Sequence, residues 1–162
     1  LRMFGREAKE DPEAIDPRLA VENALDLMGT QLRLSGIEIV TELPKSCPTI
    51  LGHVIQLEQV ILNLLANARD AMSDKDAPAK ILLRVSSDDK NVRITTEDTG
   101  GGIPKDILER IFEPFYTTKK IGEGTGLGLS VSYGIVRDMG GRIVAENFNE
   151  GARITIILPI SS

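Results

Sequence analysis

The chain has 162 residues, enough for one domain with a hydrophobic core but hardly for two. It is 41% hydrophobic and 27% charged with a formal net charge of −5, a balance typical of soluble globular proteins that excludes a broadly basic face for nucleic acid. One histidine and one cysteine exclude a zinc cluster and an internal disulfide, and no apolar run approaches the roughly 20 residues of a membrane span. We therefore expect a cytoplasmic domain without direct membrane contact.

The first third of the chain predicts a helix, a strand and a loop. Asp16 followed by Pro17 is typical of a helix N-terminus, and apolar residues at helical spacing extend this helix to about Leu34. The alternating residues 37–41 predict a strand, and the proline-bounded residues 44–48 predict a loop.

A second helix, predicted over residues 53–72, is apolar on nearly every side, which indicates a buried helix. One narrow polar stripe recurs at intervals of three or four residues, so its members share one helical face. The stripe comprises Gln56, Gln59, Asn63, Asn67 and Asp70. Because a buried amide without a partner costs about 1–3 kcal/mol, the stripe is either paired internally or faces a ligand.

The second half of the chain predicts strands and helices in no regular βαβ order. Residues 79–86 and 91–97 predict the two strands of a hairpin, residues 105–111 a short helix and residues 112–125 a long loop. Residues 127–139 predict a third long helix, and residues 142–146 and 153–158 predict the two final strands. This order predicts an α/β fold in which a mixed sheet is covered by helices on one face, a two-layer α/β sandwich.

Two glycine-rich runs, residues 98–104 and residues 122–129, flank the long loop. Glycine permits positive φ and a close approach of ligand to backbone, so two such runs suggest a nucleotide site. The familiar phosphate motifs are absent: no lysine follows a glycine as a P-loop requires, and neither run has the glycine spacing of a Rossmann fingerprint. A nucleotide would therefore be bound in another way.

Four stretches in a fixed order resemble the sequence boxes of sensor histidine kinases. Residues 58–72 resemble the N box, residues 98–104 the G1 box, residues 112–115 the F box and residues 124–129 the G2 box. The resemblance covers residues 14–158 and implies the Bergerat ATP-binding fold of the GHKL superfamily, which gyrase, Hsp90 and MutL share. The N-box residues Asn67 to Met72 are typical of nitrogen-regulator-type kinases.

The resemblance implies the ATP-binding catalytic domain of a two-component sensor histidine kinase, which transfers the γ-phosphate of ATP to a histidine on a separate dimerisation domain. The implied partners are that dimerisation domain, the receiver domain of a downstream response regulator, and a second copy of the full-length protein in a homodimer. Any membrane anchor of the full-length protein lies outside these residues. His53 lacks the surroundings of the family's phosphoacceptor, and we expect it to be a surface residue near the start of the second helix.

The resemblance also divides the chain. Because the first residue is Leu1 rather than Met and residues 1–6 resemble the end of a dimerisation domain, we expect a piece cut from a longer protein. Residues 1–15 are charged and contain a proline, which predicts a linker, and residues 16–162 are expected to form the catalytic domain.

The first glycine run is implied to bind adenine. The Asp98 carboxylate would accept a hydrogen bond from the adenine amino group, a charge-assisted bond that contributes about 1.5–3 kcal/mol. Gly100 and Gly102 would let the backbone pass beneath the purine, and Ile103 would supply apolar contact. The structural alternative for Asp98 is an ordinary turn or capping residue at a strand end.

The polar stripe is implied to bind the metal and the phosphates. The side-chain oxygen of Asn67 would ligate Mg²⁺, which keeps water and substrate phosphates in its other positions. Asn63, one turn earlier, would support the phosphates or a metal-bound water, and Asp70 would contact the nucleotide or a nearby water. The alternative for Asn67 is a core amide with internal partners.

The loop and the second glycine run are implied to form a lid over the phosphates. The residues implied to contact nucleotide here are Phe115, Thr118, Lys119, Gly124, Thr125, Gly126, Leu127, Gly128 and Leu129. Lys119 or its neighbour Lys120 would contact the β- and γ-phosphates, and the glycines would present backbone N–H groups at the positive end of a helix dipole. The alternative for the lysines is a solvated loop. Phe112 and Phe115 are expected mainly as packing anchors of the lid.

Asn63 separates two classes of enzyme. Hydrolytic relatives carry a glutamate here as a general base, and an amide cannot take a proton at neutral pH. The sequence thus favours a kinase, with Asn63, Asn67 and Lys119 as its catalytic residues, over a GHKL-type ATPase; a nucleotide-binding pseudokinase scaffold is the alternative that is not an enzyme. Ala152 stands where the family often has a threonine that completes the water network at adenine, so that one hydrogen bond is in doubt.

Overall fold

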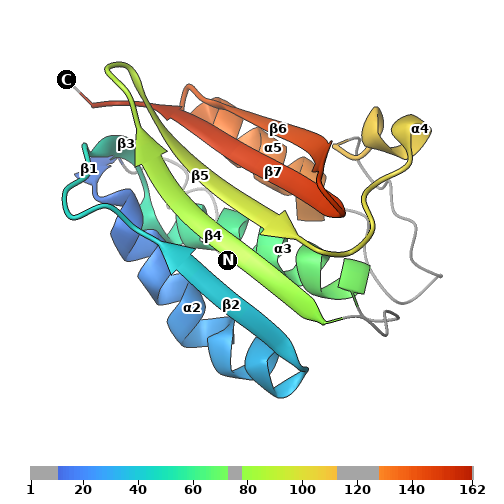
Figure 1. The fold of residues 1–162 in the computed structure, drawn as a ribbon. Helices are drawn as coiled ribbons and strands as arrows, with labels where there is room; N and C mark the ends of the chain where they lie inside the picture. Colours follow the sequence, from blue (N-terminus) through green and yellow to red (C-terminus); the bar gives the residue numbers. More distant parts are fainter. Residues whose placement is uncertain (1–10, 73–77, 113–127, 162) are drawn as a thin grey trace, which may run out of the picture.

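The computed structural model describes residues 11–72, 78–112 and 128–161, which form one five-stranded sheet, one two-stranded sheet and helices (Figure 1). The helices are α2 (Pro17–Leu34), α3 (Val54–Met72), α4 (Lys105–Leu108) and α5 (Gly128–Asp138). The strands are β1 (Glu13–Ile15), β2 (Ile37–Glu42), β3 (Ile50–Gly52), β4 (Ala79–Ser87), β5 (Asn91–Asp98), β6 (Arg142–Phe148) and β7 (Gly151–Pro159).

The larger sheet has the strand order β2-β4-β5-β7-β6. β2 lies parallel to β4, whereas every other neighbouring pair is antiparallel, so the sheet is mixed. The three long helices α2, α3 and α5 lie together on one face of this sheet (Figure 1). The predicted two-layer α/β sandwich with a mixed sheet is confirmed.

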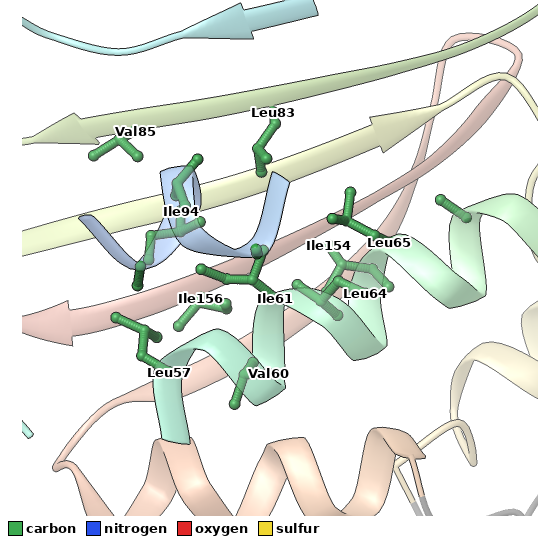
Figure 2. Close-up of a cluster of buried hydrophobic side chains, with 14 of the residues drawn as sticks. Leu57, Val60, Ile61, Leu64, Leu65, Leu83, Val85, Ile94, Ile154 and Ile156 are labelled. Atoms are coloured by element: carbon green, nitrogen blue, oxygen red, sulfur yellow. The ribbon is translucent and has the colours of Figure 1, made fainter. Parts of the chain in front are cut away.

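The hydrophobic core lies between the three long helices and the sheet, and α3 supplies much of it. Apolar residues recur along α3 at helical spacing, and their side chains meet those of the inward-facing residues of β4, β5 and β7 (Figure 2). The cluster in Figure 2 includes Leu57, Val60, Ile61, Leu64, Leu65, Leu83, Val85, Ile94, Ile154 and Ile156. All of these residues are buried, as the continuous apolar surface of the predicted helix indicated.

The smaller sheet pairs β1 with β3 in antiparallel register, with Ile15 opposite Ile50. Both isoleucines are buried, and Ile50 also bridges to Ile160 just after β7. The sequence pattern predicted neither strand, and it assigned residues 1–15 to a linker. Strands of three residues are too short to show the alternation by which a strand is recognised.

The structure confirms the predicted start of α2 and corrects the predicted end of α4. Oδ1 of Asp16 accepts the backbone N–H of Arg18 at 2.9 Å, which confirms Asp16 as the N-cap of α2. The helix predicted over residues 105–111 is wrong in length, because α4 ends at Leu108. The N–H of Arg110 bonds the carbonyl of Ile107 at 2.9 Å, a tighter turn that ends the α-helix after one turn.

A row of alternating charges crosses all five strands on the face away from the long helices. It runs Glu42, Arg84, Glu97, Arg153 and Glu146, with closest N–O distances of 2.8, 3.7, 3.0 and 3.6 Å. Opposite charges on neighbouring strands favour one strand register, because a slip of one residue would move each side chain to the other face. The Glu97–Arg153 pair thereby adds to the backbone pairing of β5 with β7 next to Asp98.

No helix among the described residues combines the length and the apolar character that crossing a bilayer requires.

Ile61 tests the packing of α3 on the sheet. We expect Ile61→Ala to lower the free energy of unfolding by about 2–5 kcal/mol, because the fully buried side chain leaves a cavity. The matched control is Ile55→Ala on the same helix, whose side chain is 74% exposed and whose loss should change stability by less than about 0.5 kcal/mol. Urea unfolding measures both variants, and equal losses would contradict the assigned core.

Candidate functional site

Asp98, the last residue of β5, has its carboxylate held by two backbone groups. Oδ1 accepts the N–H of Gly100 at 2.9 Å and the N–H of Ala152 at 3.3 Å. Among the residues that the structure describes, none donates a hydrogen bond to Oδ2. Burial raises the pKa of this carboxyl above its ordinary value, and the two backbone hydrogen bonds offset only part of that rise. The arrangement fixes one oxygen and leaves the other as an acceptor.

The close approach of β7 to Asp98 depends on Gly151. A Cβ atom at position 151 would overlap the carbonyl oxygen of Asp98, so only glycine allows the two backbones to lie this close. The next N–H, that of Ala152, is thereby brought to the carboxylate. The doubt raised by Ala152 therefore concerns its missing hydroxyl alone, since its backbone still contacts Asp98.

Gly100 joins the Asp98 segment to the end of α3. A Cβ atom at position 100 would lie 2.8 Å from Cβ of Ala71 and 2.9 Å from its carbonyl oxygen. Packing against α3 explains why a glycine is required at position 100. The passage of this backbone beneath a purine stays a prediction. Ala71 follows Asn67 by one helical turn, about 6 Å along the axis, so the polar stripe ends close to the segment that follows Asp98.

The polar stripe of α3 is partly paired internally. Nδ2 of Asn67 donates to the backbone carbonyl of Asn63 at 2.8 Å, and Nδ2 of Asn63 donates to Oγ of Ser132 on α5 at 3.1 Å. Gln59 donates to Oδ1 of Asn63 at 3.3 Å. Asn63, Asn67 and Asp70 are all half-buried, and Asp70 lies 3.5 Å from the guanidinium of Arg69.

The side chain of Asn67 offers the oxygen ligand, Oδ1, that a hard cation requires. Its amide nitrogen is bound to the helix, and none of the described residues donates to its Oδ1. The described residues contain no group of three or more His, Cys, Asp and Glu side chains that could hold a metal ion. An ion at Asn67 would therefore take most of its ligands from water or from a bound anion, which fits the coordination habits of Mg²⁺.

The predicted lid lies mostly outside the described residues. Phe115, Thr118, Lys119 and residues 124–127 are among those outside, so their contacts with nucleotide stay predictions. At its edges, Gly128 begins α5 and Leu129 packs half-buried against the core. Phe112 packs as expected, since its ring stacks on Tyr133 of α5 with centroids 5.8 Å apart, whereas its role as an anchor of the lid stays a prediction.

Three contacts in the site were not predicted. Ser132 is fully buried and ties Asn63 to α5, although a serine within an amphipathic helix gives no sign of this role. Asn147, at the end of β6, binds both backbone groups of Ile103. The N–H of Ala152 binds Asp98. The glycine directly before Ala152 was the available indication of a close backbone approach.

Comparison with known proteins identifies the family. Residues 52–162 match the family described as histidine kinase-, DNA gyrase B-, and HSP90-like ATPase. The chain is 44% identical to the two-component sensor PprA of Pseudomonas aeruginosa, over all of the chain and 18% of that protein. It is 32% identical to the C4-dicarboxylate transport sensor protein DctB of the same species, over 95% of the chain and 25% of that protein. The chain thus spans a quarter or less of these two relatives.

Solved structures agree with this assignment. The catalytic domain of the histidine kinase ThkA is 27% identical with a TM-score of 0.82, covering 94% of this chain and all of that domain. Full-length ShkA in complex with AMPPNP is 29% identical with a TM-score of 0.79, covering 93% of this chain and 31% of that protein. The resemblance to sensor histidine kinase catalytic domains is confirmed, whereas the nitrogen-regulator type stays a prediction.

Asp98→Asn tests the cost of burying the carboxylate. Because the pKa of Asp98 is raised in the fold, its charged form is disfavoured there, and we expect the variant to be at least as stable as the unaltered chain at pH 7. The advantage should shrink as the pH falls through the raised pKa towards the ordinary value, since the unaltered carboxyl then becomes neutral as well. Thermal unfolding from pH 7 to pH 4 measures this difference, and a variant that is less stable throughout would contradict it.

Proposed function

Because the chain belongs to the family of histidine kinase-, DNA gyrase B-, and HSP90-like ATPases, we propose that it binds ATP with Mg²⁺ and transfers the γ-phosphate to a histidine on a separate dimerisation domain. The observation that carries this proposal is the Asp98 carboxylate, with Oδ1 held by two backbone N–H groups and Oδ2 left as an acceptor. The 6-amino group of adenine is a donor that fits Oδ2. ShkA, which is similar over most of this chain, was solved with AMPPNP, an analogue of ATP, and this supports nucleotide binding.

The metal belongs to the same proposal. Asn67 would hold Mg²⁺ through Oδ1, because its amide nitrogen is already bound to the carbonyl of Asn63. The bound ion would neutralise charge on the phosphates. Lys119 and the glycines of the second run are proposed to contact the phosphates, and Thr118 is proposed to contact the nucleotide.

The reaction is proposed to be transfer rather than hydrolysis. An imidazole nitrogen attacks the γ-phosphorus, the bond from that phosphorus to the bridging oxygen breaks, and ADP leaves. Such a step requires positioning and charge neutralisation, and the nucleophile is already present in the acceptor. Asn63 donates through Nδ2 to Ser132, and its amide has no basic atom with which to activate water.

The names of the relatives support the proposal for the partners. PprA is named a two-component sensor and DctB a sensor protein, and each is much longer than this chain. We place the acceptor histidine on a dimerisation domain of the full-length protein, which would act as a homodimer. The phosphate would then pass to the receiver domain of a response regulator.

The proposal is tested by mixing the chain with a separately made histidine-bearing dimerisation domain and ATP labelled in its γ-phosphate. We expect label on the histidine. At low ATP concentration, Asp98→Asn and Asn67→Ala should each reduce labelling by about tenfold or more, since each removes a contact of roughly 1.5–3 kcal/mol. The matched control is Gln31→Ala, which removes an exposed amide from α2.

Two outcomes would contradict the proposal. ATP binding without label on histidine would exclude the transfer and leave a nucleotide-binding scaffold. Steady release of inorganic phosphate by the chain alone would favour a GHKL-type ATPase. An asparagine at position 63 would then not distinguish phosphoryl transfer from hydrolysis.

A further inference from the structure

The segment that follows Asp98, residues 99–103, is held by the end of β6, the start of β7 and the turn between them. The N–H of Gly101 donates to the carbonyl of Glu150 at 2.7 Å, and the N–H of Ala152 donates to Asp98 at 3.3 Å. Both contacts use backbone donors, and the first also has a backbone acceptor, whereas the second depends on the Asp98 carboxylate. The segment and the turn therefore form one unit, although more than forty residues separate them in the sequence.

Asn147 supplies the side chain in this unit. Its Oδ1 accepts the N–H of Ile103 at 2.6 Å, and its Nδ2 donates to the carbonyl of Ile103 at 2.8 Å. One amide thus pairs both backbone groups of one residue, as a neighbouring strand would. Gly102, directly before it, has φ of +87°, and a Cβ there would lie 2.9 Å from Oδ1 of Asn147. The pairing fixes the peptide orientation of Ile103 in a conformation that suits glycine at position 102.

The requirements of strand β6 alone do not explain an asparagine at position 147. Asparagine is disfavoured within strands, and this one is solvent-exposed, so burial does not explain it. Its two hydrogen bonds both go to Ile103, at the end of the segment that Asp98 begins. The segment is therefore held at both ends, by Ala152 at Asp98 and by Asn147 at Ile103.

We propose that Asn147 is a positioning residue for the nucleotide base. This assignment rests on the proposed function, in which Asp98 binds the adenine amino group and Ile103 contacts the purine. By fixing Ile103 before the ligand arrives, Asn147 removes part of the ordering cost that binding would otherwise carry. Asn147 itself does not touch the reacting phosphate, so its effect falls on nucleotide affinity and not on the chemical step.

The experiment compares Asn147→Ala with Asn149→Gly in the same chain, by calorimetric titration with Mg-ATP and with adenosine. Loss of two hydrogen bonds that order the segment should raise the Kd for both ligands about tenfold in Asn147→Ala. Asn149→Gly alters the same turn, and because Asn149 has φ of +53°, glycine fits there without strain. This control should bind both ligands like the unaltered chain.

A kinetic measurement separates positioning from a general structural defect. In the labelling reaction with the dimerisation domain, Asn147→Ala should raise KM for ATP while the rate at saturating ATP stays within about twofold, because base contacts made equally in ground and transition states affect KM alone. Asn147→Asp keeps the acceptor for the N–H of Ile103 but sets a carboxylate oxygen against the carbonyl of Ile103, so its KM for ATP should also exceed that of the unaltered chain. This second variant carries the test if Asn147→Ala does not fold.

The outcomes distinguish the two proposals. Unchanged affinity in Asn147→Ala beside weakened affinity in Asp98→Asn would overturn the role of Asn147 alone. Equal losses in Asn147→Ala and Asn149→Gly would overturn it as well, because the turn as a whole would then be responsible. Failure of the unaltered chain to bind Mg-ATP would overturn the proposed function and this assignment together.

Discussion

The close contact between the start of β7 and Asp98 is the constraint on which the site depends. Only glycine at position 151 lets the two backbones approach so closely that the N–H of Ala152 reaches the carboxylate. The carboxylate is half-buried, and this burial disfavours its charge and raises its pKa above the ordinary value. A buried acceptor of this kind costs free energy in the empty protein, and a matching donor on a ligand offsets that cost.

The rest of the fold holds the end of α3 close to the end of β5. α3 lies on the sheet through a continuous hydrophobic cluster (Figure 2), and Ala71 in its last turn packs against Gly100. The row of charges that includes Glu97 and Arg153 fixes the strand register beside Asp98. The metal-binding candidate Asn67 lies one helical turn before Ala71, and the base-binding candidate Asp98 lies two residues before Gly100, which packs on Ala71. In the proposed function, the nucleotide has its base at Asp98 and its phosphates at Asn67.

The sequence predicted those features whose cause is local or repeated. Helical and alternating periodicity marked the long helices and the strands, and the box-like stretches marked Asp98, Asn63 and Asn67. What it could not predict depends on contacts between distant residues: the short strands β1 and β3, the serine that binds Asn63, and the pairing of Asn147 with Ile103. A three-residue strand has no pattern of its own, and an asparagine before a turn reads as turn chemistry until its partner is known.

The most direct test of this account follows the backbone amides of Gly100 and Ala152 by nuclear magnetic resonance while Mg-ATP or Mg-GTP is added. We expect ATP to shift both resonances, because in the proposed site their shared acceptor Asp98 also binds the 6-amino group of adenine. GTP should shift them far less, because guanine carries an acceptor oxygen at that position. Equal responses to the two nucleotides, or ATP binding that leaves both amides unmoved, would contradict the central role of Asp98.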